Sequence, residues 1–133
     1  MYQKKATEMS IQQGCIRWFA IQYPRLRKLL IHVTNEGKRS YVQGKQLVKG
    51  GLVKGVADLI LFIPNKDYHA LCIEMKTQSK SSKQTNEQKE WQALVETQGY
   101  KYVICRSLDD FIDEINSYLP EKIRSICDNF GDF

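Results

Sequence analysis

The sequence predicts an α/β fold in which helices cover both faces of a mixed central β-sheet. Residues 71–105 give a strand, a helix and a second strand in succession, the pattern of a crossover between parallel strands. Residues 57–63 and 69–76 are two apolar strands on either side of a turn, which adds an antiparallel pair. Because residues 59–63 are apolar on both faces of their strand, we expect helices on both sides of the sheet. The predicted architecture is therefore three layers, α/β/α.

The first predicted helix covers residues 6–23 and ends at Pro24, which cannot continue a helix. Five residues recur on one face of this helix: Glu8, Gln12, Cys15, Ile16 and Phe19. Since this face is mostly apolar, we expect Glu8 to point inward with the apolar side chains.

Three shorter elements follow the first helix. Residues 29–33 are typical of a strand and residues 35–39 of a turn. Residues 40–49 predict a short helix, which Gly50 and Gly51 close.

The central hairpin turns at residues 64–67, a Pro-Asn-Lys-Asp segment with strong turn chemistry. If the turn centres near Lys66, Phe62 faces Ala70 and Ile60 faces Cys72. The same register places Asp58 opposite Glu74, where Cβ atoms are roughly 4.5–5.5 Å apart and like charges repel.

The helix between the last two predicted strands has a capping box at its start. Thr85 is followed three residues later by Gln88, and Gly99 closes the helix. Its predicted buried stripe consists of Trp91, Leu94 and Val95.

The end of the chain predicts one strand and two helices. Residues 102–105 are the strand, and Ser107 opens an amphipathic helix that reaches Leu119. Pro120 stops that helix, and a short helix at residues 123–127 follows.

Asp58 and Glu74 predict a metal site, because two facing carboxylates on otherwise apolar strands need a compensating cation. A hard divalent ion such as Mg²⁺, bound by few carboxylates and several waters, suits them. Side chains alternate along a strand, so Lys76 lies on the same face as Glu74. A metal-binding carboxylate pair beside an ammonium group suits phosphodiester hydrolysis.

Each of these residues also has an ordinary structural interpretation. Asp58 could cap a turn beside Gly55, and Glu74 with Lys76 could form the solvent-facing side of a strand. Against this, Glu74 interrupts an apolar run, where an unpaired charge is costly. We therefore favour the functional interpretation, in which Lys76 stabilises charge on the phosphate or orients the attacking water.

The chain resembles the VRR-NUC (virus-type replication-repair nuclease) branch of the PD-(D/E)XK nucleases. Asp58 followed by Glu74-Met75-Lys76 resembles the D…ExK core of that superfamily. The resemblance continues, in the family's order, at Glu8 with Gln12, residues 35–39, residues 55–59 and residues 88–91. Val56-Ala57 stands before the Asp where the family often has a proline, a departure that does not touch the chemistry.

The resemblance implies a restriction-endonuclease-like fold, Mg²⁺ or Mn²⁺ as cofactor, and DNA as substrate. It makes Glu8 a further acidic residue at the metal site, and the backbone carbonyl of Met75 an additional ligand. It also gives Gln88 the role of holding Lys76 or the substrate phosphate. Glu8 could instead simply favour the helix dipole in a first turn, and Gln88 could simply complete the capping box.

The charge of the chain is unevenly distributed. Residues 1–54 hold eleven Lys or Arg against two acidic residues, and residues 55–133 hold nine against thirteen. The local net charges of +9 and −4 give the overall +5. A basic half suits a polyanion bound from one side, although a solvated Lys-rich surface is equally common. The phosphate-contact candidates are Lys38, Arg39, Lys45, Lys49 and Lys54.

Length and cysteine content point to one intracellular domain. The 133 residues fit a single domain, residues 1–133, with a core of its own. Its four cysteines show no CxxC spacing, and only His32 and His69 could join them, which disfavours structural zinc. No signal-peptide pattern or membrane-length apolar run is present, so we expect a soluble cytoplasmic protein that acts at DNA.

The predicted function is a metal-dependent DNA nuclease. The resemblance suggests branched DNA in replication and repair, or in a virus or phage, with Holliday junctions a specific case. Two alternatives stay open: a non-catalytic nucleic-acid-binding domain, and a restriction-type endonuclease, for which the chain is small. A phosphatase for small phosphates is disfavoured, since the chain lacks a glycine-rich phosphate loop.

A homodimer is also expected, because symmetric cutting of a four-way junction needs two sites related by a two-fold axis. The C-terminal segment has more apolar residues than one sheet face requires. These residues are Phe111, Ile112, Ile115, Tyr118, Leu119, Ile123, Ile126 and Phe130. Most should pack on the sheet, and we expect some of them to form the dimer contact.

Overall fold

The structure, a computed structural model, describes residues 5–34 and 41–124, with the backbone alone for residues 41–43. The elements, in chain order, are α1 (Glu8–Gln22), η1 (Pro24–Leu29), β1 (Leu30–His32), α2 (Tyr41–Lys49), β2 (Leu59–Leu61), β3 (Leu71–Met75), α3 (Asn86–Thr97), β4 (Lys101–Cys105) and α4 (Leu108–Tyr118).

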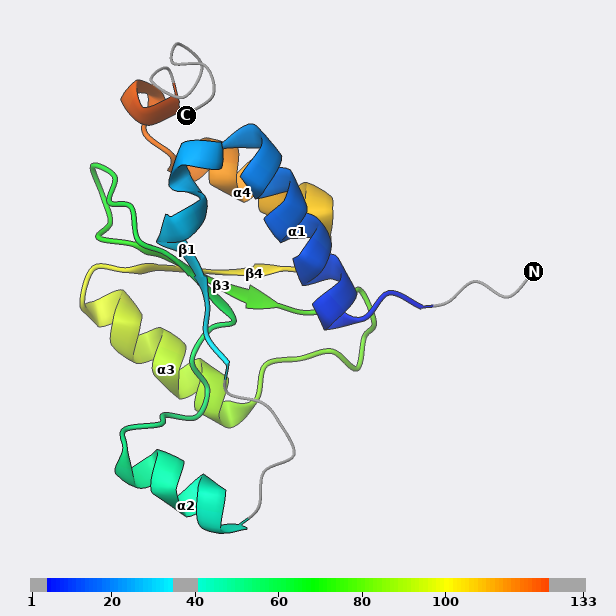
Figure 1. Cartoon of the computed structure of the whole chain (residues 1–133), viewed down its shortest axis with the longest axis vertical. Helices are drawn as coiled ribbons and strands as arrows, with labels where there is room; N and C mark the ends of the chain where they lie inside the picture. The colour runs from blue at the N-terminus through cyan, green and yellow to red at the C-terminus, as the bar shows by residue number, and fades with distance from the viewer. Residues whose placement is uncertain (1–4, 35–40, 125–133) are drawn as a thin grey trace.

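The sheet has the strand order β1-β2-β3-β4 and is mixed, as predicted. Strands β1, β2 and β3 pair antiparallel, whereas β3 and β4 pair parallel. Helices α1 and α4 lie together on one face of the sheet, and α3 lies on the other (Figure 1). Helix α2 lies on the side of α3, away from α1 and α4 (Figure 1). The α/β fold with three layers is therefore confirmed.

Two apolar clusters follow this layering. The larger one joins odd-numbered residues of β2 and β3, such as Leu59 and Ile73, to α1 and α4. The smaller one joins Cys72 and Tyr102 to Trp91 on α3. Successive strand residues therefore alternate between the two helix layers, which is why the strands are apolar on both faces.

The register of the central hairpin is the predicted one. Leu59 pairs with Ile73, Ile60 with Cys72 and Leu61 with Leu71. Extended by one residue beyond Leu59 and Ile73, this register would place Asp58 opposite Glu74.

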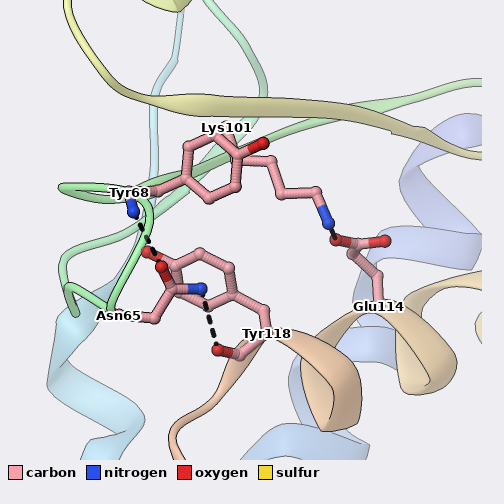
Figure 2. Close-up of polar contacts among 5 residues, drawn as sticks. All are labelled: Asn65, Tyr68, Lys101, Glu114 and Tyr118. Carbon is pink, nitrogen blue, oxygen red and sulfur yellow. Dashed lines mark hydrogen bonds and ion pairs between the residues drawn. The ribbon is translucent and has the colours of Figure 1, made fainter.

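The turn of this hairpin is anchored to the end of α4. Asn65 Oδ1 accepts hydrogen bonds from the backbone N–H groups of Asp67 (2.9 Å) and Tyr68 (2.8 Å). Asn65 Nδ2 donates to the backbone oxygen of Tyr118 at 3.2 Å (Figure 2). The Tyr118 hydroxyl in turn donates to the backbone oxygen of Ile63 at 2.6 Å. The asparagine thus forms the tight turn and holds it against α4.

Helices α3 and α4 begin as the sequence predicts. Thr85 caps α3 in a capping box with Gln88, and Gly99 follows the helix at φ +86°. Ser107 caps α4. One part of the α3 prediction was wrong: Trp91 and Val95 are partly buried, but Leu94 is 65% exposed.

The chain before β1 differs from the prediction in detail. Helix α1 is capped by Thr7 through a second capping box with Ser10, which the sequence analysis did not identify. Gln12, Cys15 and Phe19 form its buried face, whereas Glu8 is only partly buried. After α1, Pro24 opens the 3-10 helix η1, so the first strand is shorter than predicted.

The apolar face of α4 packs within the chain. Phe111, Ile115, Tyr118 and Leu119 are buried in the larger cluster. Little of the apolar surface of α4 is therefore available for a dimer contact. Ile126 and Phe130, also predicted to contribute, lie outside the described residues. Residues 121–124 form the helical turn expected near Ile123, and the remainder of that predicted helix also lies outside the described residues.

Three of the four cysteines, Cys15, Cys72 and Cys105, are buried free thiols. Burial raises the pKa of Cys15 to about 12 and that of Cys72 to about 11, which suits core residues that stay protonated. Across the described part of the chain, no helix is both long and apolar enough to cross a membrane.

Candidate active site

The fold gathers the predicted catalytic residues on the α3 face of the sheet, at one end of the central hairpin. Asp58 immediately precedes β2, Glu74 lies in β3 and Lys76 follows β3 directly. Gln88 lies in the first turn of α3, which covers this face. Glu74 is only 2% exposed and Lys76 only 6%, so both side chains are buried.

Hydrogen bonds fix the Glu74 carboxylate at both oxygens. Gln88 Nε2 donates to Glu74 Oε1 at 2.9 Å, and the Tyr102 hydroxyl donates to Glu74 Oε2 at 3.3 Å. Asp58 is held separately, since its Oδ2 accepts the backbone N–H of Met75 at 2.7 Å. The two acidic side chains are thereby placed side by side.

The electrostatics of this pair call for a positive ion. The pKa of Glu74 is raised to about 9, chiefly by burial and also by the charge of the adjacent Asp58 and a hydrogen bond shared with it. Lys76 opposes this rise. The two carboxylates therefore do not both carry full charge at neutral pH without additional positive charge beside them.

The donor set fits a hard divalent cation. Carboxylate oxygens are what Mg²⁺ prefers, and this ion commonly takes one or two of them and retains waters. The N–H and C=O groups of a strand residue point to the same side, so the Met75 carbonyl faces the side on which its N–H meets Asp58. Asp58, Glu74 and this carbonyl would be the protein ligands.

The structure does not bring Glu8 into this pair. Glu8 Oε1 accepts a hydrogen bond from Ser82 Oγ at 3.4 Å, on the loop after β3. Among the described residues, no three His, Cys, Asp or Glu side chains are grouped so that they could hold a metal. The metal role of Glu8 stays a prediction.

Gln88 serves the helix and the site at once. Its Oε1 accepts the backbone N–H of Thr85 at 2.8 Å, which completes the capping box, while its Nε2 bonds Glu74. The structural and the functional interpretation of this residue are therefore compatible. Its contact is with Glu74, whereas the resemblance implied contact with Lys76 or a phosphate.

Close packing of Gly55 brings the start of α3 to the carboxylates. Gly55 has φ +87°, and a Cβ there would lie 2.5 Å from the Glu87 carbonyl carbon and 2.9 Å from the Gln88 nitrogen. Only glycine allows the segment before Asp58 to approach the α3 backbone this closely. This role of Gly55 was not predicted from the sequence.

A cavity of about 380 Å³ opens at this contact and is lined by Lys54, Gly55, Val56, Asp58, Thr85, Glu87 and Gln88. Lys54, a predicted phosphate contact, thus borders the site. Lys45 and Lys49 lie on α2, and both are exposed. Lys38 and Arg39 lie outside the described residues.

A larger cavity of about 560 Å³ lies between the start of α1, the loop after β3 and the start of α4. Asp58 and Gln88 line the smaller cavity and not this one, and Glu74 lines neither, so we place the chemistry at the smaller cavity. The loop beside it is well held: Arg106 Nη1 donates to the backbone oxygens of Thr77 (2.6 Å) and Ser82 (2.8 Å).

Tyr102 and Gln84 complete the site and were not identified from the sequence. Gln84 Nε2 donates to the Tyr102 hydroxyl at 3.2 Å and to Gln92 Oε1 at 2.8 Å. The parallel register pairs Tyr102 with Cys72, one step along the same face from Glu74. A prediction of that register would have found Tyr102.

Comparisons with known proteins identify the family and the fold. The family model of the VRR-NUC domain matches residues 6–109. A solved structure described as "VRR_NUC domain protein" superposes with a TM-score of 0.75 and 27% sequence identity, over 88% of this chain and 91% of that chain. No curated protein matches significantly.

Proposed function

The chain belongs to the VRR-NUC family, a nuclease-type domain, and we propose that it hydrolyses the phosphodiester backbone of DNA with Mg²⁺ or Mn²⁺. The observation that carries this proposal is the pair formed by the buried Glu74 and the half-buried Asp58, with Lys76 two residues beyond Glu74. Such a pair has no evident structural purpose in an apolar sheet, since it raises the free energy of the fold unless a cation joins it.

Each protein group has a defined part in the proposed reaction. Asp58 and Glu74, with the Met75 carbonyl, would hold the metal, which when bound would polarise the phosphate and lower the pKa of an attacking water. Gln88 keeps Glu74 in place from α3. Lys76 offsets the negative charge that grows on the phosphate. Its buried position strengthens that effect, because a charge with little access to solvent is screened less.

The proposed substrate is DNA, and branched DNA in particular. Lys54 borders the cavity beside Asp58, and Lys45 and Lys49 extend the positive charge along α2. These side chains would contact phosphates without reading bases. So small a domain offers little surface for base recognition, which favours selection by DNA shape over a restriction-type specificity.

Cleavage of a four-way junction on opposite arms would need two copies of this site, and we propose a homodimer. Because the apolar face of α4 is used within the chain, the interface would lie elsewhere. Ile31, in the outer strand β1, and Phe62, directly after the neighbouring strand β2, are exposed apolar side chains and are our candidates for the contact.

Cleavage assays on labelled DNA test the proposal. Linear duplex, flap, splayed-arm and four-way substrates are incubated with Mg²⁺, Mn²⁺ or EDTA. We expect metal-dependent cleavage that Asp58→Ala and Glu74→Ala abolish, with DNA affinity in EDTA little changed. Glu96→Ala, which removes an exposed carboxylate near the far end of α3, is the control and should cut normally.

If the Glu74→Ala protein cleaved DNA at the wild-type rate, this hairpin would not be the active site. DNA binding without cleavage of any substrate, in either metal, would favour a non-catalytic binding domain. If light scattering showed a monomer and only flaps or single strands were cut, the proposal that the protein cleaves four-way junctions would be refuted. The nuclease proposal would stand.

A further inference from the structure

We propose that Tyr102 is a positioning residue of the metal site, whose hydroxyl orients the Glu74 carboxylate toward the ion. This inference rests on the proposed function. Its basis is a chain of hydrogen bonds that runs from α3 through β4 to Glu74.

The Tyr102 side chain has one well-defined position. It is 8% exposed and packs in the smaller apolar cluster, with its ring centroid 6.2 Å from that of Trp91. Its strand runs parallel to β3, and it lies on the same face as Glu74. The ring therefore carries the hydroxyl to the Glu74 carboxylate with little freedom to move.

The direction of the hydrogen bonds follows from the neighbours of the hydroxyl. Gln84 donates its amide N–H to the hydroxyl oxygen at 3.2 Å. The oxygen accepts this bond, so its own hydrogen is available for Glu74 Oε2 at 3.3 Å. Gln84 is itself oriented by donating to Gln92 Oε1 at 2.8 Å. The Tyr102 hydroxyl that donates to Glu74 Oε2 is thereby oriented through Gln84 by Gln92 on α3.

Both oxygens of Glu74 are then held by uncharged donors, Gln88 on one and Tyr102 on the other. Each carboxylate oxygen has a second lone pair beyond these two bonds, and a cation that displaces the proton shared with Asp58 could bind there. A lysine or arginine in either place would have neutralised the charge that attracts the metal. Neutral partners orient the carboxylate and leave its charge, as expected of residues that support metal ligands.

The test is Tyr102→Phe, which keeps the ring and removes the hydroxyl. Binding of Mn²⁺ is measured without DNA by titration calorimetry, and cleavage is measured against Mg²⁺ concentration. We expect the Mn²⁺ dissociation constant and the Mg²⁺ concentration for half-maximal cleavage to rise together, by about 10-fold. The cleavage rate at saturating metal should change much less.

Tyr118→Phe is the matched control, because it removes another buried hydroxyl whose hydrogen bond goes to the Ile63 backbone oxygen, at 2.6 Å. This variant should lose thermal stability and keep wild-type metal affinity. Gln84→Leu is a second test variant that leaves the tyrosine in place. It should weaken Mn²⁺ binding in the same direction as Tyr102→Phe, by a smaller factor.

Metal affinity of Tyr102→Phe within twofold of wild type, or an equal loss in Tyr118→Phe, would overturn the inference while the nuclease proposal stands. A wild-type protein that binds no Mn²⁺ and cuts no DNA would instead overturn the proposed function, and this inference with it.

Discussion

Replacement of Gly55 by alanine tests whether the contact between the Asp58 segment and α3 builds the site. The added methyl group meets backbone atoms, which cannot rotate away as a side chain could. It would lie 2.5 Å from the Glu87 carbonyl carbon, nearer still to its oxygen, and 2.9 Å from the Gln88 nitrogen. Gly55 also has φ +87°, a backbone conformation that alanine adopts only with strain.

Two costs add in the Gly55→Ala protein. The positive φ costs about 1–2 kcal/mol. Relief of the overlap costs about 1–3 kcal/mol more, as in other overpacked sites. Ordinary contact begins near 3.4 Å, so the start of α3 must retreat by about 0.9 Å from the carbonyl carbon. A shift of that size would stretch the 2.9 Å bond between Gln88 and Glu74 beyond hydrogen-bonding distance.

We therefore expect Gly55→Ala to lose about 2–5 kcal/mol in urea unfolding and to bind Mn²⁺ more weakly. Two glycine variants separate the causes. Gly51 has φ +105° and open space around it, so Gly51→Ala should show the backbone cost alone and normal metal binding. Gly14 lies inside α1 with nothing within 4 Å, so Gly14→Ala should stabilise by about 0.5–1 kcal/mol. Equal destabilisation in Gly55→Ala and Gly51→Ala would refute the close approach.

Three further outcomes are expected. The pKa of Glu74 is raised from 4.5 to about 9, so its contribution to stability is full below pH 4.5 and is lost as pH rises through 9. In EDTA the wild-type protein should therefore unfold more easily at pH 9 than at pH 5. If Glu74→Gln showed the same dependence of stability on pH as the wild type, Glu74 would not be the group responsible. Lys76→Ala should lower the cleavage rate about 10²–10³-fold with calorimetric Mn²⁺ binding retained; lost metal binding would give this lysine a different role. Reversal of charge at Lys45 and Lys49 should weaken binding to all DNA sequences alike and reduce the salt slope by about 1.8, whereas Lys66→Glu, at the far turn of the hairpin, should change neither.

Local sequence signals predict much of the fold. The Pro-Asn-Lys-Asp turn and the alternation of the flanking strands set the hairpin register, and with it the pairing of Asp58 and Glu74. The capping box at Thr85 begins α3 where the sequence indicates, because its hydrogen bonds are made within one helical turn. The carboxylate pair could be predicted for the same reason, since a single turn joins its two strands.

The surroundings of that pair depend on contacts between distant parts of the chain. Tyr102 reaches Glu74 through a parallel strand register that no turn sets, and Gly55 meets α3 only after the helix has packed on the sheet. The exposure of Leu94 and the contact of Glu8 with Ser82 likewise depend on how the helices dock. Sequence alone therefore determined which residues carry the charge. Tertiary structure decided which neutral groups hold that charge in place, because packing between elements, and not local periodicity, sets those distances.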